Sequence, residues 1–292
     1  MEGIILRGIG SFYTVEDRAG SGLYTLRAQK KLRRTGLKPL VGDRVAFMPG
    51  EGEEDGWIEQ ILPRKNELVR PSVANVDTLM LVLAPVPLPD MVMIDKLILR
   101  ARRGGMTPAI CVNKTDLESD LPQRIGREYA GSELHSFFVS ARTGAGLEAL
   151  RPMMEGRVTC LAGQSAVGKT SLLNALFGLE METGGLSEKT ERGRHTTRRA
   201  ELMALGGAYV MDTPGFSLLE LDDDLTPLDI AGYYTEYAAL EEGCRFQPCL
   251  HDREPGCAVR RAVEKGELGQ QRWKRYRTLL AEARENQKGR YT

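Results

Sequence analysis

The sequence predicts a multidomain protein: a β-barrel in residues 1–70, an α/β domain in residues 71–220 and a helical domain in residues 221–292. Three observations support this division. Short β-like runs separated by turns come first, apolar strands alternating with helices follow, and a helical stretch interrupted by a cysteine cluster comes last. A chain of 292 residues is also longer than one hydrophobic core usually organises.

The first part contains five short β-like runs, GIILRG, SFYTVED, LYTLRAQ, DRVAFM and WIEQIL. Glycines and prolines separate them in GIG, AGSG, VGD and MPGEGEEDG. Several short strands at close spacing indicate a small β-barrel. We expect an OB fold, and an SH3-like barrel is the alternative that gives a similar pattern.

The second part alternates strand-like and helix-like segments. The strands are TLMLVLAP, PAICVNK, SFFVSA, RVTCLAG and a strand pair in AELMALGGAYVMD. The helices are MVMIDKLILRARRGG, LPQRIGREYA, GLEALRPM and TSLLNALFG. This alternation indicates a mostly parallel sheet covered on both faces, and ligands bind such sheets at the carboxyl ends of the strands.

The stretch GQSAVGKT fits the phosphate-binding pattern G-x-x-x-x-G-K-[ST] and lies between a predicted strand and a predicted helix. In that context the loop backbone wraps the phosphates and the helix N-terminus attracts anions, which makes a chance glycine-rich turn the weaker interpretation. Lys169 is predicted to act catalytically on the β- and γ-phosphates, and the Thr170 hydroxyl to bind Mg²⁺. The predicted phosphate-binding residues are Gly163, Gln164, Ser165, Ala166, Val167, Gly168, Lys169, Thr170 and Ser171.

A second motif, DTPG, ends the apolar run AYVM. Asp212 at this strand end is predicted to hold Mg²⁺ through water, as the corresponding aspartate of P-loop NTPases does. The Gly215 N–H can approach the γ-phosphate because no Cβ intervenes. Asp-x-Pro-Gly alone is also a good turn, and its position after the phosphate-binding loop favours the nucleotide interpretation.

VNKTD and VSARTG predict that the nucleotide carries guanine. Asp116 can accept hydrogen bonds from the N1–H and the exocyclic amine of guanine, and adenine would leave this carboxylate unpaired. Asn113 is predicted to brace the base and the loop, and the Lys114 stem to lie over the ring. Ser140 and Ala141 match the short loop whose backbone N–H meets guanine O6. NKTD alone fits any polar loop, but four motifs at strand ends of one domain indicate a shared site.

VNKTD precedes GQSAVGKT, whereas an ordinary GTPase carries these motifs in the opposite order. We interpret this order as a circular permutation. Only the positions of the strand ends matter in the folded site, and surface connections tolerate such rearrangement.

The segment GGLSEKTERGRHTTRRA lies between the phosphate-binding loop and DTPG, and it is polar without an apolar period. The pattern predicts a loop, and its position indicates a switch region in which Thr196 or, preferably, Thr197 coordinates Mg²⁺. His195 is the predicted catalytic residue that orients water, because Phe216 stands where many GTPases carry a glutamine. A solvent-exposed loop histidine is the alternative. We expect slow hydrolysis until a partner orders the loop.

The stretch CRFQPCLHDREPGC has the spacing C-x₄-C-x-H-x₅-C. Three thiolates and one imidazole are typical of tetrahedral structural zinc and leave no open coordination position. A redox or disulfide role is the alternative. The predicted zinc ligands are Cys244, Cys249, His251 and Cys257.

Composition adds little about partners, because Lys plus Arg and Asp plus Glu both total 40. Basic residues gather in 27–38 and 260–277, with Trp273 and Tyr276 in the second group. Such clusters suit an RNA backbone and its bases, although a charge run is usually a solvated face. The N-terminus lacks signal-peptide features and TLMLVLAPVPLP is too short to span a bilayer, so we expect a cytoplasmic protein without a membrane partner.

In the order NKTD, SA, GQSAVGKT, GRHTT, DTPGF and C-x₄-C-x-H-x₅-C, the chain resembles the ribosome small-subunit-dependent GTPase A family. These are circularly permuted GTPases implicated in late maturation of the bacterial 30S subunit, and the resemblance covers essentially the whole chain. Two positions depart from the family pattern. Ala166 stands where the family typically has glycine, and Thr170 where it usually has serine.

The resemblance implies an N-terminal OB fold, a zinc-bearing helical C-terminal domain and a catalytic role for His195. It also implies hydrolysis of Mg²⁺-bound GTP to GDP, stimulated by the 30S subunit and accompanied by contact with its 16S rRNA. We expect a monomer. Two alternatives are a permuted GTPase that serves the large subunit and a nucleotide-gated RNA-binding protein whose hydrolysis is incidental.

Overall fold

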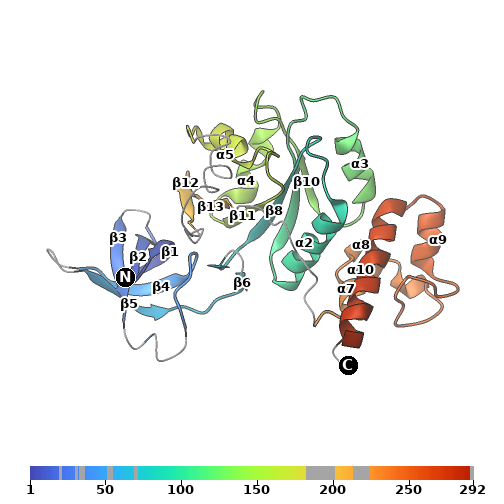
Figure 1. The fold of residues 1–292 in the computed structure, drawn as a ribbon, viewed down its shortest axis with the longest axis horizontal. Helices are drawn as coiled ribbons and strands as arrows, with labels where there is room; N and C mark the ends of the chain where they lie inside the picture. Colours follow the sequence, from blue (N-terminus) through green and yellow to red (C-terminus); the bar gives the residue numbers. More distant parts are fainter. Residues whose placement is uncertain are drawn as a thin grey trace.

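The computed structural model describes residues 1–19, 22–29, 32, 37–50, 55–68, 72–181, 201–212 and 224–289. Within them an α/β domain lies between an N-terminal barrel and a C-terminal helical region (Figure 1). None of the helices in these ranges combines the length and apolar character needed to cross a membrane. Several residues discussed above lie outside the described residues: His195, Thr196, Thr197, Gly215 and Phe216, together with Lys30, Lys31, Arg33 and Arg34 of the basic run 27–38.

The barrel consists of β1 (Glu2–Ile9), β2 (Phe12–Asp17), β3 (Leu23–Ala28), β4 (Arg44–Met48) and β5 (Gly56–Ile61). The strands close in the order β1-β2-β3-β5-β4, with β3 parallel to β5 and β4 paired back onto β1. Alternate side chains such as Val15, Leu26 and Phe47 are fully buried inside. This five-stranded closure confirms the predicted OB-fold barrel.

A short strand pair that the sequence did not predict, β6 (Glu67–Leu68) with β7 (Val73–Ala74), links the barrel to the next part. The buried Asn75 follows it and secures the link. Its side chain donates to the carbonyl oxygen of Gly42 at 3.0 Å and accepts from the Lys65 N–H at 3.0 Å. Two residues per strand give too little alternation to be recognised in a sequence.

The central sheet contains six strands in the order β10-β9-β8-β11-β13-β12. All neighbours are parallel except β12, which pairs antiparallel with β13. Its strands are β8 (Thr78–Leu83), β9 (Thr107–Val112), β10 (His135–Phe138), β11 (Val158–Ala162), β12 (Met203–Leu205) and β13 (Ala208–Asp212). The motifs NKTD, SA and GQSAVGKT follow three parallel strands and Asp212 ends a fourth, so the strands bring them to one edge of the sheet.

Helices cover both faces of this sheet, as the continuous apolar strands predicted. Leu79 and Leu81 of β8 belong to the core beneath α2 and α3, whereas Met80 and Val82 belong to the core beneath α5. The helical elements are α2 (Met91–Arg103), α3 (Leu121–Glu128), η1 (Leu147–Ala149), α4 (Arg151–Met154) and α5 (Lys169–Phe177). Cys111 and Cys160 are buried in this domain, and burial raises the pKa of both thiols to about 12.

The C-terminal region packs against α2 through a cluster of aromatic rings. Tyr234, Tyr237 and Tyr276 are buried there, with ring centroids 4.7 to 5.1 Å apart, and Leu99 of α2 belongs to the same core. The helical elements are α7 (Pro227–Gly232), α8 (Thr235–Ala238), η2 (Glu241–Gly243), α9 (Ala258–Glu264) and α10 (Gln270–Gly289). Because α10 lies beside α2 (Figure 1), the two regions share one packed interface.

The interpretation of residues 260–277 as an exposed basic cluster is wrong for the central arginines. Arg272 is 2% exposed, donates to Asp95 Oδ1 at 2.7 Å and also contacts Glu236. Arg275 donates to Asp95 Oδ2 at 2.6 Å and to Glu128 at 2.7 Å. Buried charges require such partners, and a basic run in a sequence does not show which acidic side chains it will meet.

Candidate functional site

The loop between β11 and α5 follows a path that side chains would obstruct. Gly163 has φ 156°, and a Cβ there would lie 2.3 Å from the carbonyl oxygen of Val82. Gly168 has φ 92°, and a Cβ there would lie 2.6 Å from the side-chain nitrogen of Asn113. Ala166 also has a positive φ, 64°, a conformation that costs a non-glycine residue about 1–2 kcal/mol. The loop therefore holds an alanine in a conformation better suited to glycine.

Lys169, the first residue of α5, folds its side chain back onto this loop. Its ammonium group donates to the carbonyl oxygens of Gly163 at 3.0 Å and Gln164 at 3.1 Å. Burial lowers the pKa of Lys169, and the nearby charge of Asp212 opposes that effect. A cation at the N-terminus of a helix beside a glycine-rich loop gives the loop a strong preference for anions.

Asp212 ends β13 close to Lys169 and Thr170 at the start of α5. Burial raises the pKa of Asp212, whereas Lys169 and Thr170 lower it. Among the described residues, Asp212 Oδ1 has no hydrogen-bond partner although it is buried. A carboxylate oxygen left open beside a hydroxyl is a donor set that suits a hard divalent cation.

Asn113 joins three loops at the edge of the sheet. Its side-chain nitrogen donates to the carbonyl oxygen of Val167 at 3.0 Å, and its side-chain oxygen accepts the Ala141 N–H at 3.0 Å. The neighbouring Lys114, with φ 60°, donates to the carbonyl oxygens of Ala166 at 2.7 Å and Val86 at 3.0 Å. The structure thus brings NKTD and the SA loop against the phosphate-binding loop.

Asp116 has a polar partner on each carboxylate oxygen. The Ser140 hydroxyl donates to Oδ1 at 2.6 Å, and an Arg142 nitrogen lies 2.9 Å from Oδ2. The Ser140 bond, helped by the charge of Arg142, keeps the pKa of Asp116 below its ordinary value. Sequence reasoning missed Arg142, although its place directly after Ser140 and Ala141 in VSARTG was a usable signal.

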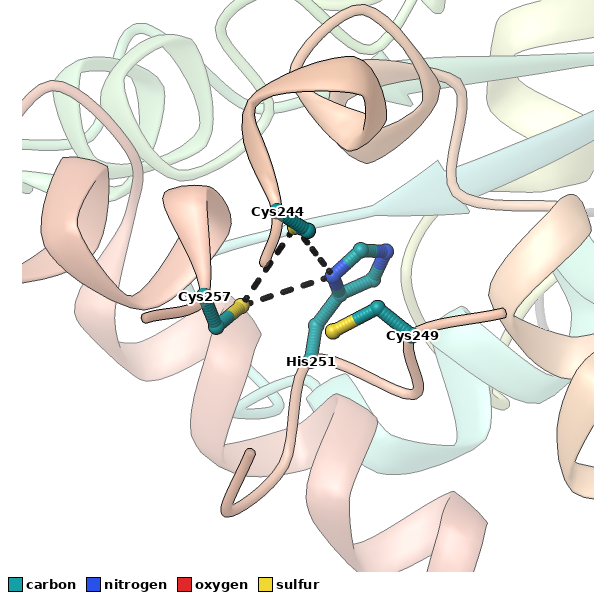
Figure 2. Close-up of side chains that lie close together, drawn as sticks. All are labelled: Cys244, Cys249, His251 and Cys257. Atoms are coloured by element: carbon teal, nitrogen blue, oxygen red, sulfur yellow. Dashed lines mark hydrogen bonds between the residues drawn. The ribbon is translucent and has the colours of Figure 1, made fainter. Parts of the chain in front are cut away.

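The four predicted zinc ligands converge in the C-terminal region. Cys244, Cys249, His251 and Cys257 each offer a ligand atom, and all four atoms lie within 4.8 Å of one another. Figure 2 shows the three sulfur atoms and the imidazole gathered around one space. The four residues come from a single loop between η2 and α9, so the local sequence determines the cluster.

The separations in this cluster fit a metal ion and not a disulfide. Cys244 Sγ lies 3.9 Å from Cys257 Sγ, and His251 Nδ1 lies 3.7 and 3.5 Å from those two sulfurs. Tetrahedral zinc, with bonds of about 2.3 Å to sulfur and 2.0 Å to nitrogen, would separate its ligands by about 3.8 Å and 3.5 Å. All the cysteines in the described residues are free, and no disulfide joins them.

Surrounding groups hold these ligands in place. The Ala258 N–H donates to Cys244 Sγ at 3.3 Å and the Arg260 N–H to Cys257 Sγ at 3.5 Å, contacts that favour thiolates. From α10, the Trp273 indole donates to the carbonyl oxygen of His251 at 2.9 Å. Trp273 therefore supports the cysteine loop, and the Arg277 guanidinium lies over its ring at 4.9 Å from the centroid.

Several comparisons bear on the identity of the chain. The model of the RsgA GTPase family matches residues 61–222, and that of the RsgA N-terminal domain matches residues 2–58. The small ribosomal subunit biogenesis GTPase RsgA of Caldanaerobacter subterraneus subsp. tengcongensis is 41% identical, covering 100% of this chain and 98% of that protein. Its namesake in Moorella thermoacetica is 42% identical, covering 97% of each.

Two solved structures are also similar to this chain over nearly its whole length. YjeQ from Thermotoga maritima superposes with a TM-score of 0.80 and 33% identity, covering 97% of this chain and 98% of that one. YloQ, described as a circularly permuted GTPase, gives a TM-score of 0.80 and 32% identity, covering 97% and 95%. The fold and the convergence of the NKTD, SA and phosphate-binding loops define a circularly permuted P-loop GTPase, an enzyme that hydrolyses GTP. More specifically, the chain belongs to the RsgA GTPase family.

Proposed function

We propose that this GTPase binds the small (30S) ribosomal subunit and hydrolyses GTP to GDP and phosphate during late maturation of that subunit. Hydrolysis is slow alone and stimulated by the subunit. Relatives that match nearly the whole chain carry the name small ribosomal subunit biogenesis GTPase, which supports this role. The main structural support for GTP binding and hydrolysis is the hydrogen bond of Asn113 to Val167. This bond joins the predicted base-reading loop to the predicted phosphate-binding loop.

In this proposal Asp116 reads guanine. Its carboxylate accepts the N1–H and the exocyclic amine of the base, while Ser140 keeps it oriented. Asn113 holds the loop, the Lys114 stem covers the ring, and a backbone N–H near Ala141 meets O6. An adenine base lacks both donors, so it leaves a carboxylate without partners and binds poorly.

The phosphates occupy the loop 163–171, where the Lys169 ammonium exchanges its two carbonyl partners for phosphate oxygens. Thr170 and Asp212 would hold Mg²⁺, and the open Oδ1 of Asp212 fits that role. A bound Mg²⁺ neutralises charge on the phosphate oxygens. Thr197 and the Gly215 N–H complete the γ-phosphate site, and His195 orients the attacking water.

In the C-terminal region, Cys244, Cys249, His251 and Cys257 bind one structural zinc ion, for which the ligand separations fit. The proposal also includes a cytoplasmic monomer that contacts 16S rRNA. Because Arg272 and Arg275 are buried, exposed residues make the contact with 16S rRNA in this proposal.

The decisive experiment measures the GTPase rate of the purified chain alone, with purified 30S subunits and with 50S subunits. We expect strong stimulation by 30S subunits only. Stimulation by 50S subunits alone would indicate a role on the large subunit. No stimulation by either would indicate a nucleotide-gated binding protein whose hydrolysis is incidental.

A further inference from the structure

Arg142 lies at the rim of the predicted base site, and its side chain is 75% exposed. It contacts Asp116 Oδ2 at 2.9 Å, on a carboxylate that is only 12% exposed. The other oxygen, Oδ1, accepts the hydroxyl of Ser140, which is 1% exposed and therefore fixed. Asp116 thus has one buried partner, Ser140, and one largely exposed partner, Arg142.

Guanine presents two donors side by side, N1–H and the exocyclic amine, and a carboxylate meets such a pair with both of its oxygens. Resting on the proposed guanine-reading role of Asp116, we propose that Arg142 competes with guanine for Asp116 Oδ2. It occupies this oxygen in the empty site and withdraws when the base binds. Arg142 thereby sets the affinity for guanine nucleotides.

The free energy of the Arg142–Asp116 contact is consistent with such an exchange. A nearly buried carboxylate oxygen without a donor is costly, so Arg142 lowers the free energy of the empty site. An ion pair that is largely exposed on one side is weak and screened by salt, so the base can displace the guanidinium readily. The displaced side chain needs no new partner because it enters solvent.

The backbone N–H of Arg142 is a second group of this residue that bears on base binding. The Ala141 N–H is donated to Asn113, whereas the Arg142 N–H has no hydrogen-bond partner within the described part of the chain. The Arg142 backbone N–H therefore remains available to donate to the base. Guanine entering this position meets the Arg142 backbone and replaces the Arg142 side chain.

The test measures GDP affinity by calorimetry for the intact chain and for Arg142→Ala at low and high salt. We expect Arg142→Ala to bind GDP roughly two- to fivefold more tightly at low salt, the range that an exposed ion pair supports. The gain should disappear at about 1 M salt, where the screening length falls to about 3 Å. Arg142→Lys, which keeps the charge, should fall between the two proteins.

Two further variants make the result decisive. Arg18→Ala removes another exposed, ion-paired arginine, on the barrel, and should leave GDP affinity unchanged. Asp116→Asn should transfer preference from guanine to xanthine nucleotides, and Arg142→Ala should then add nothing. Unchanged guanine preference in Asp116→Asn would overturn the proposed base-reading role itself. A switch to xanthine combined with equal or weaker GDP binding by Arg142→Ala would overturn the Arg142 proposal alone.

Discussion

The side-chain amide of Asn113 donates to the carbonyl oxygen of Val167 at 3.0 Å, across 54 positions of the chain. This bond joins the loop after β9 to the loop after β11, although the permuted chain reaches the first loop well before the second. The geometry of the site therefore depends on contacts between loops and not on their order.

Gly168→Ala should break this bond, because the new Cβ would lie 2.6 Å from the Asn113 side-chain nitrogen. Losing one hydrogen bond and straining the loop should weaken GDP binding about tenfold or more, as measured by calorimetry. Gly178→Ala is the matched control. It has φ 65° but open space around it, so it should cost about 1–2 kcal/mol of stability and leave affinity unchanged. Equal losses of affinity in both variants would contradict the prediction.

Asp95→Asn should destabilise the protein by about 3–5 kcal/mol, because it leaves buried Arg272 and Arg275 without their shared carboxylate. Urea unfolding followed by circular dichroism measures the loss. Glu285→Gln, which breaks an exposed pair with Lys288, should change stability by less than about 1 kcal/mol. Similar midpoints for the two variants would show that the buried ion pairs do not stabilise the interface.

Metal analysis of the freshly purified chain should find about one zinc per molecule, as one four-ligand site requires. Cys249→Ser should lose this zinc and melt at a lower temperature, because metal binding contributes to folding of the cysteine loop. Cys111→Ala removes a buried thiol elsewhere and should retain the zinc. Zinc bound equally by both variants would exclude the proposed ligand set.

Stability should fall between about pH 10 and pH 12, in part through Tyr209. Burial and a hydrogen bond to Glu16 at 2.6 Å raise the pKa of this phenol to about 12, above its ordinary value of about 10. Between these pH values the unfolded chain has released the proton while the folded chain retains it, so unfolding becomes more favourable as pH rises. Denaturant unfolding across this range should show a shallower decline for Tyr209→Phe. Identical slopes would refute the assignment.

His195→Ala should reduce the rate of GTP hydrolysis on the 30S subunit by roughly 10²–10⁴-fold, the usual contribution of a group that positions water or transfers its proton. GDP affinity should be unchanged, because the proposed role concerns the attacking water alone. Single-turnover hydrolysis and calorimetry together separate the two quantities. A normal rate would return His195 to the alternative of an ordinary loop residue.

Much of this architecture was predictable because its signals are local. Alternation of apolar residues located the barrel strands, and glycines placed the phosphate-binding loop between β11 and α5. The metal cluster could also be predicted from the sequence, because its four ligands lie within residues 244–257. Each of these features depends on neighbours in the chain, which a sequence displays directly.

Features that depend on distant partners were not predictable. Arg272 and Arg275 belong to a basic run in the sequence. Nothing in that run indicates that both arginines form ion pairs with Asp95 on α2. The place of Arg142 beside Ser140 and Ala141 was visible in the sequence, but its ion pair with Asp116 was not, because that contact crosses from the loop after β10 to the loop after β9. Long-range pairing of charges is decided by packing, which periodicity alone does not encode.

The placement of the α/β domain between the barrel and the C-terminal helices sets a minimum size for a shared partner (Figure 1). Anything that touches both outer regions at once must reach across the full width of the enzyme between them. A small soluble protein that binds only one loop cannot satisfy this condition, whereas a large particle with two separated contact areas can.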